Sequence, residues 1–591
     1  MKKKYVRWTL WTIASPFILF IILCILIYLP PIQNFLVDKA AVYASEATGM
    51  NISVGRISLS FPLNLVVTDV DAASPHNDTL LSVRRLQVNV QLLPLLKKQV
   101  EVDGISLQGA TVNSNDLIHG MKLNGTLGEL FISSHGVALD PETAIVNKVL
   151  LKDTDLSLCL NDTAAADTAA SDTTYWKIIL QDIDLQNVSF ALDMPLDSLS
   201  LAASLDNAIL RDGLIDLHKS AYSLQTFRIE NGRVRYDNGK PLAADSLSSG
   251  LDPSHIALTD IGVKLDSLYY GGRNMKAIIS QFVLKERSGV EIVSATGRMV
   301  SNDKVLRVPS LKLETRDSYL ELNAAMDWNA LDFKDEGLVS ARLMADIGKP
   351  DVVRFMGSMD EKFIRQYPSE PLRIRTGIDG DLNKLKLTTL TAELPGALGL
   401  FARGELTHLT DSLLRGGDIT LEAETKDLKF VSTLAEGIEI PYGTRLEGKF
   451  TMAGTKMGTD LLLMQPEAQA VVAADTIPIT VYNDSISVAD DFKMERAARL
   501  FAKYDLSRDR YEADLAVNHF DLHQFMPADS LYTLSTRLKV EGEGFDFFSP
   551  RTYFKAEGGI DRFHYGSYHL TGISLAAGAC FTGSEKLDHG Y

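Results

Sequence analysis

The sequence predicts a mainly β protein: an N-terminal transmembrane helix followed by a long twisted, curled β-sheet groove with a few short helices. Three observations lead to this fold class. A long apolar segment lies near the N-terminus, strand-type alternation dominates from residue 52 onward, and helical periodicity is confined to short runs. Roughly thirty strands are too many for one compact core, so we expect the sheet to curl, with one apolar and one polar face.

Residues 1–37 are expected to form a cytoplasmic tip and a transmembrane anchor. No charged residue lies between Arg7 and Asp38, and a helix over residues 8–29 would be about 33 Å long, enough to cross a bilayer. Four cations precede the segment and favour a cytoplasmic N-terminus. A cleaved signal peptide is the alternative, but the apolar run ends in two prolines and not in a small-residue cleavage site. The sequence thus predicts a single-pass protein with its bulk outside the cytoplasm.

Composition narrows the classes of partner. The net charge of −17 argues against nucleic acid, whose phosphates require basic patches. Three cysteines, one of them inside the anchor, exclude a disulfide framework and a thiolate metal site. A bridge between Cys159 and Cys580 remains open, although two unrelated thiols are the favoured interpretation.

An eleven-residue phrase recurs four times after residue 100. It reads VDGISLQGATV at 102–112, LQDIDLQNVSF at 180–190, LQTFRIENGRV at 224–234 and LTDIGVKLDSL at 258–268. In each copy the apolar residues change parity at a Gly, Asn or Asp, which are Gly109, Asn187, Asn231 and Asp266. Such residues tolerate the backbone angles of a β-bulge, which would return all the apolar residues to one face. A strand–turn–strand hairpin is the equally weighted alternative.

The phrases predict the residues that line the apolar face of the groove. The predicted lining residues are Ile105, Leu107, Val112, Ile183, Leu185, Val188, Phe190, Phe227, Ile229, Val234, Ile261 and Val263.

A second, larger repeat occupies the C-terminal half. Alternating strands end at Asp346, Asp427 and Asp521, and each is followed by a short helical run that a proline stops. The helical runs are 352–367, 430–435 and 523–526, and the strands after them are 372–380, 444–454 and 536–544. The spacing of this unit predicts a further copy near residue 610. We therefore expect a longer protein, in which residues 38–591 alone would dimerise or aggregate through an open sheet edge.

These patterns divide the chain into six segments. They are the tip and anchor (1–37), an N-terminal β region (38–160), a disordered loop poor in hydrophobic residues (161–174), a β-groove with bulged strands (175–340), strand–helix–strand repeats of the groove (341–581) and a polar tail (582–591).

The sequence offers no support for an enzyme, a cofactor or a metal site. No phosphate-binding loop or nucleophile elbow is present. His519 and His523 are four residues apart, but they fall where a strand passes into a helix and no acidic motif accompanies them. The Asp379-Gly380-Asp381 segment is better explained as a hairpin turn than as a calcium loop.

One dense motif remains. Asp followed by Ser or Thr and then by an apolar residue or Thr occurs eleven times, against roughly three expected by chance. The motif resembles the O-glycosylation signal of periplasmic proteins in Bacteroidetes, although Asp-Ser and Asp-Thr also favour turns. The candidate acceptors are Thr163, Thr168, Thr173, Ser198 and Ser246.

The first 115 residues resemble the N-terminus of the AsmA/TamB family of envelope proteins. The resemblance rests on an ordered set of elements after the anchor: ATGMNI at 47–52, VGRISL at 54–59, FPL at 61–63, TDV at 68–70, LLSV at 80–83 and LLPLL at 92–96. The family implies an inner-membrane anchor and a periplasmic sheet curled into an open groove that carries lipid between the membranes. The C-terminal domain of the longer family members has no counterpart here.

The resemblance implies two functions. The first is the carriage of phospholipid between inner and outer membrane by contact with its acyl chains. The alternative is a translocation and assembly factor that helps to insert outer-membrane proteins through an outer-membrane barrel partner, with client strands adding to a sheet edge. A passive tether is a weaker third interpretation.

Overall fold

The computed structural model describes residues 50–60, 64–74, 79–91, 102–114, 120–138, 142–161, 176–239, 250–334, 337–356, 360–434, 437–465, 496–546 and 552–580, together with Lys39, Val42 and Ser45. These residues form 27 strands and a few short helices, which confirms the prediction of a mainly β protein. The predicted anchor, residues 162–174 of the predicted loop and the polar tail lie outside the described residues. Among the helices that are described, none has the length and apolar character needed to span a membrane.

The chain divides into two compact units, Met1–Val300 and Ser301–Tyr591. This boundary falls inside the 175–340 segment, which the sequence analysis treats as one region.

Strands of the first unit follow one another in a ladder. They are β1 (Asn51–Ser60), β2 (Asn64–Ala73), β3 (Thr79–Val90), β4 (Val102–Asn113), β5 (Met121–Ala138), β6 (Thr143–Leu160), β7 (Lys177–Met194), β8 (Leu199–Asp216), β9 (Ala221–Leu224), β10 (Thr226–Asp237), β11 (His255–Gly271), β12 (Asn274–Glu286) and β13 (Glu291–Ser301), with the 3-10 helix η1 at Pro195–Asp197. Each strand from β1 to β8 pairs with the next. Strands β9 and β10 together form the strand between β8 and β11.

One pairing in this unit is parallel. Strands β6 and β7 run in the same direction, with Leu151 opposite Leu185, whereas the other described ladders of the unit are antiparallel. Parallel neighbours need a connection that returns the full length of a strand. Strand β6 ends at Leu160 and β7 begins at Lys177, so the predicted loop falls in the sequence between these two strands.

The second unit is an antiparallel meander. Its strands are β14 (Val305–Thr315), β15 (Tyr319–Asp327), β16 (Leu338–Ile347), β17 (Leu372–Asp381), β18 (Lys384–Leu394), β19 (Leu398–Thr407), β20 (Gly416–Thr425), β21 (Arg445–Ala453), β22 (Lys456–Met464), β23 (Ala497–Asp505), β24 (Arg510–Asp521), β25 (Leu531–Glu543), β26 (Tyr553–Tyr565) and β27 (Tyr568–Cys580). Each strand pairs with the next in sequence.

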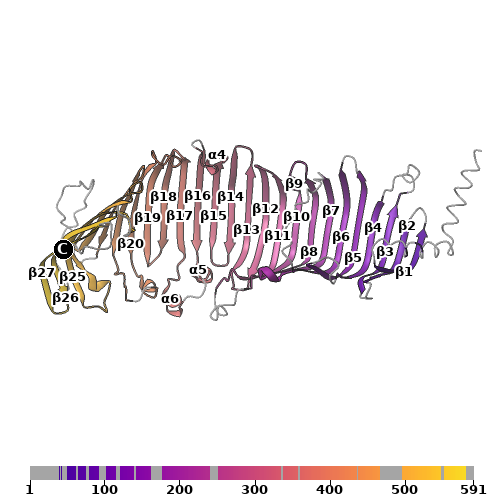
Figure 1. Ribbon diagram of the computed structural model, residues 1–591, viewed down its shortest axis with the longest axis horizontal. Coiled ribbons are helices and arrows are strands. Elements are labelled where there is room, and N and C mark those ends of the chain that lie inside the picture. The colour runs from indigo at the N-terminus through magenta and orange to yellow at the C-terminus, as the bar shows by residue number, and fades with distance from the viewer. Residues whose placement is uncertain are drawn as a thin grey trace, which may run out of the picture. The chain divides into compact units, whose positions relative to one another are not determined.

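Short helices of this unit lie at the strand ends. They are α4 (Trp328–Leu331), α5 (Lys349–Met356), α6 (Glu361–Gln366), α7 (Lys429–Ser432) and the 3-10 helix η2 (Leu522–Gln524). Figure 1 shows α4 at one end of the strands and α5 and α6 beyond the opposite end. These three described helices therefore lie beyond the strand ends and not over the middle of the strands.

The best-buried cluster of the described chain is formed by these helices. Phe363 of α6 is 2% exposed and packs on Tyr367 and on Phe430 of α7, with ring centroids 5.7 and 5.6 Å apart. Burial raises the pKa of the Tyr367 hydroxyl above its ordinary value. The hydrophobic core in the usual sense thus sits at the strand ends.

The three recurring aspartates serve two different purposes. Asp521 caps η2 by accepting a hydrogen bond of 3.1 Å from the backbone N–H of His523. Asp427 accepts one of 3.2 Å from the backbone N–H of Lys429 in the turn that leads into α7, whose N-cap residue is Leu428. Asp346 instead accepts from the Arg375 guanidinium on the neighbouring strand, at 2.6 Å.

Candidate functional site

The predicted lining residues of the first unit fall on adjacent rows of the sheet. Residues opposite one another in a ladder point to the same face, so a row can be followed from strand to strand. One row holds Ile105, Ile183 and Phe227; the next holds Leu107, Leu185, Ile229 and Val263; a third holds Val112, Phe190 and Val234; Val188 and Ile261 lie between the second and third. The rows are completed by residues such as Ile132, Leu130 and Leu210, which the sequence analysis did not single out.

Residues with a left-handed backbone conformation keep the apolar side chains of these rows on one face. Gly109, Asn187 and Asn231 have φ angles of 61°, 51° and 53°, each in the middle of a strand. Three of the four phrases lie inside single strands and the phrase at 224–234 spans β9 and β10, so the long kinked strand is confirmed and the hairpin is wrong. At Gly109 and Asn187 the ladders show no register shift, so the kink there does not insert an extra residue against the neighbouring strands. In the phrase at 258–268 the positive φ lies at Asp260 and not at the predicted Asp266. Asp266 has no partner in the β11–β12 ladder, because the register shifts between Leu265 and Ser267.

The effect of such a residue is visible at Gly232, next to Asn231. In regular β structure, residues i and i+3 lie on opposite faces. Here a Cβ atom at Gly232 would lie 3.2 Å from Cγ2 of Ile229, three residues earlier, and 3.2 Å from Cβ of Ile261 on the next strand. The kink has therefore brought Ile229 and position 232 to the same face.

The kinks form a polar seam on the opposite face. Asn187 donates to Asp153 across the β6–β7 ladder at 2.9 Å, and Asn231 donates to Asp206 on β8. Lys285 pairs with Asp260 at 2.8 Å. Asp153 also has a positive φ of 48°, so the same kind of kink occurs in β6, which contains none of the four predicted phrases.

The apolar face of the second unit runs through all fourteen of its strands. One row consists of Leu311, Leu322, Leu343, Thr376, Leu390, Ala402, Leu421, Gly448, Leu461, Leu500, Leu515, Leu538, Gly558 and Leu575. Its neighbour consists of Leu313, Leu320, Ala345, Ile374, Ala392, Leu400, Ala423, Leu446, Leu463, Ala498, Val517, Thr536, Ile560 and Ile573. Neither row contains a charged residue. The sequence analysis named no residue of this face, although plain period-2 alternation was the available signal.

Charged residues of the second unit gather on the other face, where cross-strand ion pairs connect them. Arg499 holds Asp460 through two hydrogen bonds of 2.8 and 2.6 Å, which raise the pKa of the guanidinium above its ordinary value. Similar pairs join Lys384 to Glu405, Lys449 to Asp418 and Lys539 to Glu512. Exposed ion pairs stabilise a sheet only weakly. They show instead that this face of the second unit is charged and in contact with water.

No second layer covers the apolar face in the part of the chain that is described. Strands there pack on their ladder neighbours, and the helices lie at strand ends. Phe450 and Met457, both on the apolar face, are 42% and 46% exposed. Hydrocarbon left in water costs about 25 cal/mol per Å². A face of this extent therefore favours an apolar occupant.

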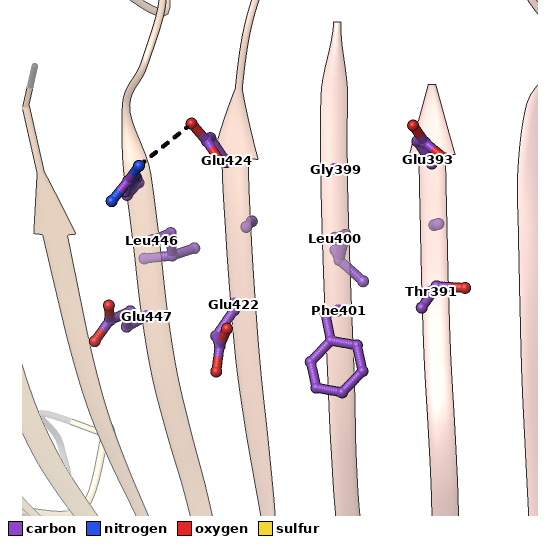
Figure 2. A pocket seen from close by; sticks show the side chains of 12 residues that line it. Thr391, Glu393, Gly399, Leu400, Phe401, Glu422, Glu424, Leu446 and Glu447 are labelled. Carbon is purple, nitrogen blue, oxygen red and sulfur yellow. Dashed lines mark ion pairs between the residues drawn. The ribbon is translucent and has the colours of Figure 1, made fainter. Parts of the chain in front are cut away.

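A hollow of ≈ 580 Å³ lies over strands β18 to β21. Figure 2 shows its rim, which includes Glu393, Glu422, Glu424 and Glu447, with Arg445 paired to Glu424 at 3.6 Å. A Cβ atom at Gly399 would meet nothing within 4 Å, so a missing side chain contributes to the depression. Its polar lining consists of carboxylates, one guanidinium and the Thr391 hydroxyl.

The remaining candidates from the sequence lie apart from one another. His519 is in β24, where its Nε2 lies 3.2 Å from the Arg562 guanidinium, whereas the His523 ring stacks on Tyr532. Within the described ranges, no group of three or more metal-ligating side chains converges. Asp379 to Asp381 lies at the end of β17, where the chain turns toward β18.

Two further expectations concern exposed chemistry. Cys159 is a free thiol. Ser198 is exposed and has a φ of 53° in the turn after η1, where its side chain lies beside Gly239. The other four candidate acceptors, Thr163, Thr168, Thr173 and Ser246, lie outside the described residues.

Comparison with known proteins assigns no family. No protein-family model matches the chain, and no curated protein is similar to it at a significant level.

Proposed function

We propose that this protein is an inner-membrane-anchored periplasmic protein whose sheet curls into a groove and carries lipid between the inner and outer membranes. The observation that carries the proposal is the uncovered apolar face, which is free of charge in the two rows that cross all fourteen strands of the second unit. Residues 8–29 supply the anchor, and the acyl chains of phospholipid are the cargo.

The chemistry of the face suits an acyl chain. Burial of a methylene group contributes about 0.8 kcal/mol and requires no hydrogen-bond partner. Successive strands repeat the same apolar row at intervals of about 4.8 Å, so a chain that moves along the row meets similar surroundings at each step. The natural right-handed twist of the strands supports curling of the sheet around such a cargo.

Photo-crosslinking at neighbouring positions of β23 tests this proposal directly. Leu500 belongs to the apolar face, and Phe501 belongs to the charged face, where the Lys503 ammonium lies 4.9 Å from its ring centroid. We expect p-benzoylphenylalanine at position 500 to form phospholipid adducts in cells, detected by mass spectrometry. The same residue at position 501 is the matched control and should form none. Equal yields at the two positions, or no adduct at position 500, would contradict lipid carriage along this face.

A charge on the lining of the first unit should interrupt transport. Leu185→Asp places a carboxylate on the apolar face, whereas Gln186→Asp places it on the exposed opposite face of the same strand. An unpaired charge buried against hydrocarbon costs several kcal/mol. We expect Leu185→Asp, but not Gln186→Asp, to raise envelope permeability to a large antibiotic at equal protein levels. Wild-type permeability in the Leu185→Asp strain would refute the lining at this point.

One observation favours the alternative role in the assembly of outer-membrane proteins. Strand β27 pairs only with β26 among the described strands, carries no charged side chain and is exposed from Tyr568 to Ala579. Such an edge can accept a client strand by β-augmentation. Ser574→Lys, which adds a charge to this strand, should lower the levels of outer-membrane proteins if the assembly role is correct. It should leave the lipid adducts at position 500 unchanged. Unchanged outer-membrane protein levels would argue against assembly.

A further inference from the structure

Four aromatic rings stack in a row across the last strands of the second unit. His523 lies on Tyr532, Tyr532 lies on His564, and His564 lies on His569, with centroid separations of 4.7, 4.7 and 4.1 Å and interplanar angles below 30°. The row begins at η2 and crosses β25 and β26 to reach β27. Its last two members are both imidazoles, and they are also the closest pair.

The backbone holds these two imidazoles opposite each other. His564 and His569 are direct partners in the β26–β27 ladder, one position beyond the pair Tyr565 and Tyr568 that closes the turn. Gly566 has a φ of 56°, which a tight two-residue hairpin turn requires. Because the connection is so short, the register of the two histidines cannot slip.

The two rings are available as ligands. His569 is exposed and His564 is half-buried. In the described part of the chain the structure shows neither a hydrogen bond nor an ion pair at either imidazole, and their ring contacts are with each other and with Tyr532. Stacking against Tyr532 orients His564 without occupying its nitrogens.

We propose that His564 and His569 form a two-histidine site for a divalent transition metal such as Cu²⁺, Ni²⁺ or Zn²⁺. Metal–nitrogen bonds of about 2.0–2.1 Å place two ligand nitrogens about 3 Å apart. Because imidazole lone pairs lie in the ring plane, the two stacked rings must turn out of the stack for their nitrogens to converge on one metal, which their directly opposite positions in the ladder allow. His523 is separated from the pair by the Tyr532 ring and is not a ligand. The remaining coordination positions face solvent, so the metal exchanges readily, and while bound it links the outermost described strand, β27, to β26.

Metal titration of the untagged full-length protein in detergent tests the site. The probes are CuCl₂, NiCl₂ and ZnCl₂ added alone, with a chromophoric indicator to report free metal. We expect one Cu²⁺ bound per chain by this pair, with affinity in the order Cu²⁺ above Ni²⁺ and Zn²⁺, as imidazole ligands dictate. Mg²⁺ and Ca²⁺ prefer oxygen ligands and should not compete.

Three variants decide the outcome. His564→Asn and His569→Asn should each weaken Cu²⁺ binding by about tenfold or more, since one imidazole remains where there were two. His523→Asn removes a histidine from the same row and should bind as the wild type does. Metal should also raise the unfolding temperature of wild type and of His523→Asn, but not of the two pair variants.

Each contrary result would overturn the proposal. If either His564→Asn or His569→Asn keeps wild-type affinity, the pair is not the site. If His523→Asn loses affinity equally, the site is not this pair alone. Circular dichroism of each metal-free variant checks that the sheet is intact, so that lost binding reflects a lost ligand.

Discussion

At the scale of single residues, the positive φ of Asn187 places the apolar side chains before and after it on the same face of the sheet. Its φ of 51° is tolerated by Asn and Gly but costs a β-branched residue about 1–2 kcal/mol. We therefore expect Asn187→Val to lower the stability of the first unit by about that amount, measured as a shift in urea midpoint. Asn187→Gly is the control and should remain close to wild type, losing only an exposed hydrogen bond to Asp153. Equal effects of Val and Gly would show that the left-handed angle is not what the position requires.

A second residue-scale prediction concerns Tyr367. Burial raises the pKa of its hydroxyl above the ordinary 10.0, so the folded state favours the neutral phenol. The resulting stabilisation is fully present below pH 10.0 and is lost as the pH rises through the folded-state value. We expect Tyr367→Phe to reduce the loss of stability between neutral and strongly alkaline pH, measured by urea unfolding. Parallel pH profiles for the two proteins would contradict this.

At the scale of elements, the short helices are stabilised by a local cluster at the strand ends. Phe363→Ala should destabilise the second unit by about 3–5 kcal/mol, because it empties a site that is 2% exposed between Tyr367 and Phe430. The control is Phe355→Ala on the neighbouring α5, where the side chain is 58% exposed and the expected change is within about 0.5 kcal/mol. Thermal unfolding of both variants distinguishes the two positions. A small effect at Phe363 would mean that the helices contribute little to the unit.

At the scale of the whole molecule, the topology of the chain is the central prediction. A reporter that is active only outside the cytoplasm, fused after residue 60, should be active, and the purified protein should retain Met1 to Pro30. A fusion before residue 8 should be inactive. A mature N-terminus near Ser45, found by N-terminal sequencing, would replace the anchor with a cleaved signal and make lipid transfer from a fixed membrane position untenable.

Much of the secondary structure could be predicted from patterns of neighbouring residues in the sequence. Period-2 alternation identified the strands, and the parity change at Asn187 identified a kink before any register was known. The short helix after Asp521 followed from a capping residue at one end and Pro527 soon after the other, whereas α7 ends at Ser432, well before Pro441. These features depend on neighbours within a few residues, so the sequence by itself determined them.

The tertiary structure decided what depends on pairing between distant segments. The parallel β6–β7 ladder, the kink at Asp260 instead of Asp266 and the stacking of His564 on His569 all follow from which strand lies beside which. The uncharged rows of the second unit are equally a matter of register, because a shift of one residue in strands such as β20 or β21 would place Glu422 or Glu447 among the leucines. Register is set by hydrogen bonds and turns acting together along the ladder. A local pattern can indicate an apolar face in each strand, but only the paired sheet joins those faces into one surface.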